Sequence, residues 1–116
     1  MKKRKKITSI RPWGKFEQFT LNEKSTVKIL TINPKKRNSL QTHKNRSEFW
    51  KALDNPFKAT IGNKTFTMKK GNEVKIPVQV KHRIIGLSKP ARLLEISLGN
   101  FNEKDIKRLE DDFRRK

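Results

Sequence analysis

The sequence contains no cysteine and no long apolar run, and each absence narrows the classes of protein it can belong to. Without cysteine there is no disulfide, no thiolate metal site and no thiol nucleophile, which fits a reducing compartment. No apolar stretch approaches the roughly 20 residues of a membrane span. The first residues also lack the apolar core of a secretory signal. The sequence therefore predicts a cytoplasmic protein that does not enter a membrane.

Acidic residues are scarce, since 11 Asp and Glu stand against 30 Lys and Arg and give a formal net charge of +19. Five of the basic residues form a run over residues 2–6, which predicts a basic tail over residues 1–10. Such a charge attracts polyanions, so nucleic-acid binding through the tail is one interpretation. The interior basic residues follow no known nucleic-acid-binding pattern, and a solvated basic surface is the interpretation that we favour.

The 116 residues fit one domain with a single core. Short clusters of β-branched and aromatic residues alternate with turn signals, which predicts strands. The expected strands are 27–32, 40–43, 48–53, 57–61, 64–68, 73–76, 82–86 and 92–98. Short strands joined by short turns indicate an all-β sandwich or a closed jelly-roll barrel.

The N-terminal segment that follows the tail is aromatic and contains proline and glycine. It runs from Arg11 through Trp13 and Gly14 to Phe19. Proline and glycine exclude a long helix here. We expect the segment to pack against the body as a lid or an edge, with Trp13 covering one face of the barrel.

The C-terminal stretch has the spacing of a helix. Asn102 is a good N-cap residue, and the apolar residues Ile106, Leu109 and Phe113 repeat at intervals of three and four. The spacing predicts a helix over residues 102–114 that lies outside the barrel or at a dimer contact. A single domain would then cover residues 11–116, with this helix at its end.

The densest polar cluster lies just before Trp50. On a strand, Gln41 and His43 point to one face because side chains alternate. Glu48 has the opposite parity, so it joins them only if a turn or bulge resets the alternation. A second histidine, His82, begins another strand. Imidazole and carboxylate groups suit divalent metals, but two structural histidines remain an alternative interpretation.

Several short motifs share one further property, a resemblance to a known family. They are Arg11-Pro12-Trp13-Gly14, Ser39-Leu40-Gln41-x-His43, Arg46-x-Glu48-x-Trp50, Thr60-Ile61-Gly62, Ile76-Pro77, Lys81-His82-Arg83, Leu94-Glu95-Ile96 and Glu110-Asp111-Asp112. Together they resemble the small cupin domain of the type II mannose-6-phosphate isomerases, which also occurs fused behind a mannose-1-phosphate guanylyltransferase. The resemblance implies a cupin double-stranded β-helix with a divalent metal ion in the barrel mouth. It also implies interconversion of mannose 6-phosphate and fructose 6-phosphate for polysaccharide precursors, with a guanylyltransferase as a partner.

The same resemblance implies roles for individual residues. The metal ligands would be Gln41, His43, Glu48 and His82, with Zn as the first choice and Mn, Co, Ni or Fe as alternatives. The substrate phosphate would be bound first by Arg46 and Arg83, which flank two of those ligands, and then by Arg37 and Lys81. The proton-transfer residue stays unassigned, and Glu95 is the other acid in a strand context.

At two positions where the family usually has histidine, this chain has Asn45 and Phe49. These departures favour an alternative function, a non-catalytic cupin that binds a sugar phosphate, a nucleotide sugar or a partner protein. A homodimer formed through the C-terminal apolar residues is a further expectation.

Overall fold

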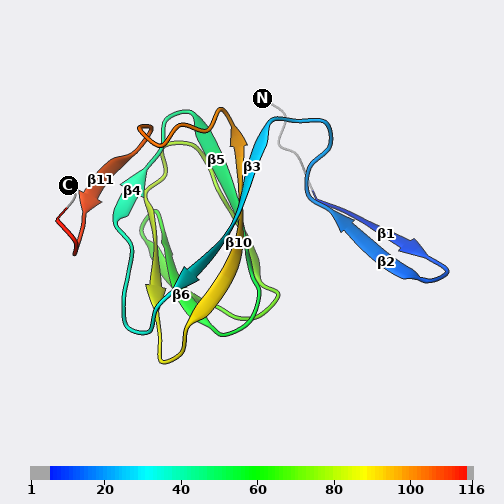
Figure 1. Cartoon of the computed structure of the whole chain (residues 1–116), viewed down its shortest axis with the longest axis horizontal. Coiled ribbons are helices and arrows are strands. Elements are labelled where there is room, and N and C mark those ends of the chain that lie inside the picture. The colour runs from blue at the N-terminus through cyan, green and yellow to red at the C-terminus, as the bar shows by residue number, and fades with distance from the viewer. Residues whose placement is uncertain (1–5, 115–116) are drawn as a thin grey trace.

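The structure, a computed structural model, describes residues 6–114, and strands are the only regular elements within that range (Figure 1). The strands are β1 (Ile7–Arg11), β2 (Gly14–Gln18), β3 (Ser25–Ile32), β4 (Leu40–Thr42), β5 (Arg46–Ala52), β6 (Phe57–Ile61), β7 (Lys64–Met68), β8 (Glu73–Ile76), β9 (His82–Gly86), β10 (Ala91–Gly99) and β11 (Lys107–Glu110). Over these described residues there is no helix with the length and apolar character needed to cross a membrane.

Two antiparallel sheets form the body of the molecule. One has the strand order β3-β10-β5-β8 and the other has the order β11-β4-β9-β6-β7. The sheets face each other around one interior, as Figure 1 shows. The predicted all-β jelly-roll architecture is therefore confirmed.

The core lies between the two sheets because each strand points alternate side chains inward. Trp50, Phe57, Met68 and Leu93 are buried there almost completely. Each such side chain contributes about 1.5–3 kcal/mol by leaving water. Polar side chains replace the apolar ones at one end of the interior, and the candidate site lies at that end.

Local sequence signals located the central strands well. The expected strands 57–61, 64–68, 73–76 and 82–86 coincide with β6, β7, β8 and β9. Gly62 and Asn63 form the turn between β6 and β7, with Phe57 opposite Met68. These strands were predictable because turn residues mark both of their ends.

The prediction of a helix over residues 102–114 was wrong. Residues 107–110 form β11, which pairs with β4, and the described part of this stretch contains no helix. A lone helix of this length is only marginally stable, whereas a strand here satisfies the open edge of β4. Ile106, Leu109 and Phe113 therefore share no helical face, and the expected dimer contact loses its basis.

The N-terminal expectations also need correction. β1 and β2 pair only with each other and form a hairpin that extends away from the barrel (Figure 1). Trp13 is 73% exposed at its tip, so it covers no barrel face. The tail expected over residues 1–10 is partly strand, because β1 begins at Ile7, while residues 1–5 lie outside the described residues. At the base of the hairpin, Phe19 packs on the body with its ring 5.3 Å from that of Phe49, and Glu17 forms an ion pair with Lys51 at 3.5 Å.

We expect Gly86→Ala to destabilise the fold. A Cβ at this position would lie 2.2 Å from the carbonyl oxygen of Asn33 and 3.1 Å from that of Lys36. Relieving such a clash requires a backbone shift, so the free energy of unfolding should fall by about 2–3 kcal/mol. Urea unfolding measures this fall. The exposed residue Ser88 provides the control, since Ser88→Ala should change little; equal stability of both variants would contradict the close approach.

Candidate functional site

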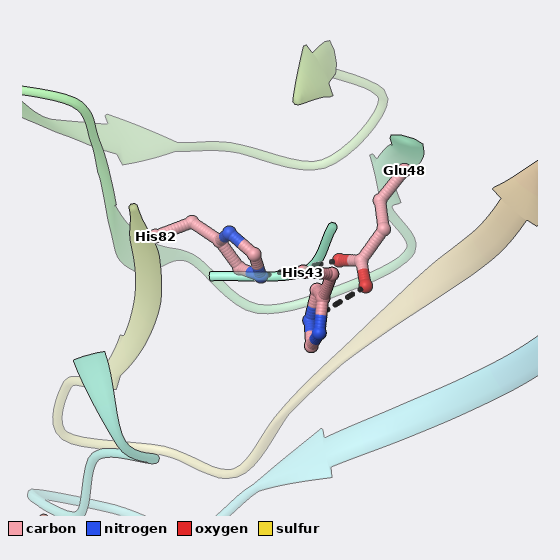
Figure 2. Close-up of side chains that lie close together, drawn as sticks. All are labelled: His43, Glu48 and His82. Carbon is pink, nitrogen blue, oxygen red and sulfur yellow. Dashed lines mark ion pairs between the residues drawn. The ribbon is translucent and has the colours of Figure 1, made fainter. Parts of the chain in front are cut away.

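Three of the predicted metal ligands meet at the polar end of the barrel interior. His43 follows β4, Glu48 lies in β5 and His82 begins β9 (Figure 2). The Nε2 atom of His43 lies 3.3 Å from Oε2 of Glu48, and Nε2 of His82 lies 3.6 Å from Oε1. All three side chains are buried, and their ligand atoms lie within 4.8 Å of one another.

A change of sheet brings Glu48 to the histidines. The chain leaves β4 in one sheet after Thr42 and enters β5 in the facing sheet at Arg46. The alternation restarts in β5, so the opposite parity of Glu48 along the sequence has no effect. The conditional expectation that a turn around residues 45–47 could bring Glu48 to the cluster agrees with this crossing.

Backbone carbonyl groups determine the orientation of both imidazole rings. Nδ1 of His43 is 2.7 Å from the carbonyl oxygen of Asp105, and Nδ1 of His82 is 2.9 Å from that of Val80. A carbonyl oxygen only accepts hydrogen bonds, so each Nδ1 carries the proton and each Nε2 is left with a lone pair. Burial lowers the pKa of His43, which keeps this ring neutral near pH 7.

One buried acceptor in this cluster is unsatisfied. Nε2 of His82 has no hydrogen-bond partner, although it is fully buried. Such a group costs free energy unless something binds its lone pair. Two imidazole nitrogens and a carboxylate around a common point form a donor set that suits a divalent metal ion. The described residues therefore fit a metal at this position.

The fourth predicted ligand, Gln41, reaches the cluster with the wrong end of its amide. Its Nε2 lies 3.3 Å from Nε2 of His43, while its oxygen accepts a hydrogen bond of 2.6 Å from Ser39. An amide nitrogen is a donor and does not ligate metals. Gln41 would have to turn its amide group to offer the oxygen.

Arg46 is the only one of the four predicted phosphate ligands that the structure shows in contact with this cluster. Its Nε donates to Glu48 at 3.4 Å, a terminal nitrogen lies 3.3 Å from Nε2 of His43, and the other donates to the carbonyl oxygen of Asn102. The guanidinium group also stacks on Phe101, 4.3 Å from the ring centre. Arg46 thus neutralises part of the charge of Glu48.

The other predicted phosphate ligands have different surroundings. Arg83 follows His82 on β9 and therefore points to the opposite face, where it donates to the carbonyl oxygen of Asn38 and to Glu110. Arg37 forms two hydrogen bonds with Asp112, at 2.8 and 2.9 Å. Lys81 lies just before β9, where its carbonyl oxygen accepts a hydrogen bond from the Gly62 amide.

Sequence reasoning left one acid beside the cluster without a role. Glu95 lies in β10 directly opposite Trp50 and points into the interior, where it is buried. Burial, followed by the charge of Glu48, raises its pKa to about 7. No local pattern placed Glu95 inside, because the opposite face of β10 carries Leu94, Ile96 and Leu98 and is the more apolar of the two.

The C-terminal segment also contributes to the site. The helix expected there from the sequence predicted no such contribution. The carboxylate of Asp105 accepts hydrogen bonds from the amides of Lys44 and Asn45, at 2.8 and 2.9 Å. These bonds, the one from Lys44 first, lower the pKa of Asp105. The crossing that carries His43 is therefore held by a residue far away in sequence, and no local pattern could have revealed this.

The two departures from the family pattern have little effect on the cluster. Phe49 follows Glu48 on β5 and so lies on the outer face, where its ring makes a tilted contact with that of Phe19. A histidine at that position would point away from His82. Asn45 is exposed in the crossing segment.

Comparisons with known proteins support this architecture. A family model described as "Mannose-6-phosphate isomerase C-terminal" matches residues 1–111. The alginate biosynthesis protein AlgA of Pseudomonas aeruginosa is 34% identical over 107 residues, which cover 90% of this chain and 22% of that protein. A mannose-1-phosphate guanylyltransferase of Salmonella montevideo is 35% identical over 107 residues, covering 90% and 23%. The chain thus spans about a fifth of the length of these curated relatives.

Solved structures share the fold at low identity. The capsular polysaccharide assembling protein CapF of Staphylococcus aureus has a TM-score of 0.69 and 15% identity, over 93% of this chain and 35% of that chain. Oxalate decarboxylase of Bacillus subtilis has a TM-score of 0.66 and 22% identity, over 75% and 24%. A cupin-superfamily sugar phosphate isomerase from Silicibacter pomeroyi has a TM-score of 0.60 and 18% identity, over 69% and 53%. The predicted cupin fold is confirmed.

Proposed function

Because the chain belongs to the mannose-6-phosphate isomerase C-terminal family, we propose that it is a metal-dependent sugar-phosphate isomerase that interconverts mannose 6-phosphate and fructose 6-phosphate. The observation that carries this proposal is the convergence of His43, Glu48 and His82, with the lone pair of His82 Nε2 buried and unsatisfied. A guanylyltransferase is the proposed partner enzyme, since relatives carry that name over a longer chain. The cytoplasmic location stays a prediction.

The chain's own residues would hold a divalent ion in the barrel. His43 and His82 offer Nε2 atoms and Glu48 offers a carboxylate oxygen, while Gln41 is the proposed fourth ligand once its amide turns. Zn is the first candidate, with Mn, Co, Ni and Fe as alternatives. When bound, the ion would supply a Lewis acid that polarises the sugar's carbonyl and hydroxyl oxygens.

An aldose–ketose isomerisation needs a group that moves a proton between neighbouring carbons. Glu95 is our choice, because it points into the interior near Glu48 and is not one of the proposed ligands. Its carboxylate would take the proton from C2 of the aldose, and the resulting acid would return it to C1. A pKa of about 7 leaves both forms populated near neutral pH. Burial also excludes water that would exchange with the proton.

A coupled assay tests the proposed function. Purified protein would be incubated with mannose 6-phosphate and Zn, Mn, Co or Ni, and fructose 6-phosphate formation would be followed before and after chelation. Turnover that chelation removes and added metal restores supports the proposal. Absence of turnover with every metal contradicts it.

A second candidate function is binding without turnover. The amide oxygen of Gln41 is held by Ser39, which leaves three residues to ligate a metal and favours a weaker site. A binding cupin would bind a sugar phosphate, a nucleotide sugar or a partner protein saturably and convert nothing. Calorimetric titration with mannose 6-phosphate on the same samples separates the two functions.

A further inference from the structure

Arg108 lies on the inner face of the barrel sheet, where no phosphate ligand was expected from the sequence. In β11 it is paired with Gln41 of β4, and Gln41 is paired in turn with His82 of β9. Directly opposed residues on antiparallel strands place their side chains on the same face. Arg108 therefore shares a face with Gln41 and His82.

An irregularity in β11 separates Arg108 from its acidic neighbour. The register with β4 shifts between Arg108 and Glu110. Glu110 then faces outward, where its carboxylate binds Arg83 at 3.0 Å. A bulge of this kind redirects one side chain relative to the next and is frequent beside active sites. Glu110 consequently leaves the positive charge of Arg108 to another partner.

The guanidinium group of Arg108 has an unsatisfied donor. Its Nε is buried and has no hydrogen-bond partner among the described residues. Arg46 differs, since all three of its side-chain nitrogens have partners. Arg83 also has an unpaired nitrogen, but it lies on the outer face of β9. Arg108 is thus the inner-face arginine that requires an acceptor.

We infer that Arg108 binds the phosphate group of the sugar phosphate whose reacting carbons lie at His43, Glu48 and His82. The identity of the ligand rests on the proposed function. The phosphate is carried by C6, at the opposite end of the sugar from C1 and C2. β11 is two strands away from β9, about 10 Å across the sheet, which suits the length of a hexose phosphate. The planar fork of an arginine matches a phosphate with two parallel hydrogen bonds.

Phosphate affinity in Arg108→Met tests the inference directly. We expect its Kd for mannose 6-phosphate, measured by calorimetry on the metal-loaded protein, to rise on the order of 10- to 100-fold. Metal content should stay unchanged. Binding of unphosphorylated mannose should change little, because that sugar offers nothing to Arg108. Arg108→Lys keeps the positive charge but lacks the planar guanidinium group, so its Kd should lie between those of wild type and Arg108→Met.

The control is Arg92→Met, since Arg92 is an arginine of the facing sheet whose exposed side chain forms an ion pair with Asp54. It should leave the Kd for mannose 6-phosphate within about twofold. Equal affinities in wild type, Arg108→Lys and Arg108→Met would overturn the inference. Inorganic phosphate as a competing probe separates the two proposals. Phosphate binding that depends on Arg108 in a protein without turnover would support this subsite and contradict the isomerase.

Discussion

Replacing His82 with alanine is expected to remove both bound metal and turnover. The substitution deletes one of the two imidazole nitrogens that converge on Glu48, and the remaining pair cannot hold a divalent ion tightly. Turnover should fall by 10³-fold or more, since the ion supplies the charge stabilisation of the reaction. Metal analysis after dialysis and the coupled assay measure the two losses on one sample.

The control for this variant is Arg92→Met. Arg92 lies in β10 at the end away from Arg46, where it forms an exposed ion pair with Asp54. The Arg92→Met variant should keep its bound metal and its turnover. Full metal content in His82→Ala would show that the cluster is not the metal site. Turnover that persists after the metal is lost would instead exclude a metal-dependent reaction.

Replacing Glu95 with glutamine should lower kcat by about 10²- to 10⁴-fold while metal content is kept. Glutamine has nearly the same shape but can neither accept nor return the substrate's proton. Because Glu95 is not one of the proposed ligands, the affinity for mannose 6-phosphate should change little. Steady-state kinetics on metal-loaded protein separates the two parameters. Glu103→Gln, at an exposed acid, is the control and should behave as wild type.

The same variant should change how stability depends on pH in the chelated protein. The folded protein keeps the Glu95 proton up to about pH 7, whereas the unfolded chain releases it near 4.5. The stability contributed by the neutral carboxyl is therefore complete below pH 4.5 and is lost as the pH rises through 7. Relative to Glu95→Gln, wild type should lose on the order of 3 kcal/mol between pH 4.5 and 8. Urea unfolding at a series of pH values measures this loss. An unfolding free energy that depends on pH equally in both proteins would contradict the burial of this acid.

The ligand cluster shows how far a local pattern reaches. Gln41, His43 and Glu48 were identifiable as a group because the motif is compact in sequence. The sequence did not show whether Glu48 faces the histidines, because the alternation of side chains predicts a face only along one continuous strand. The chain instead changes sheets between Thr42 and Arg46. The same crossing brings Arg46 to the cluster, whereas Arg83 follows His82 on one strand and points to the other face.

The C-terminal segment illustrates the opposite limit. Its apolar spacing favoured a helix, yet it forms β11, because an unpaired edge on β4 competes with local helical preference. That edge is formed by residues more than 60 positions earlier, so no window of sequence contains the information. The contacts of Asp105 with Lys44 and Asn45 and the position of Arg108 depend on this pairing.

By itself the sequence determined the class of the fold, most of the central strands and the family, because alternation, turn residues and short motifs are local properties. Only the tertiary structure decided which polar groups face one another. Strands from two sheets bring His43, Glu48, His82 and Glu95 into one interior, and a C-terminal strand adds Arg108 to the same face. The physical reason is that sheet pairing joins distant segments, and burial then gives the gathered groups lone pairs, charges and pKa values that no segment has alone.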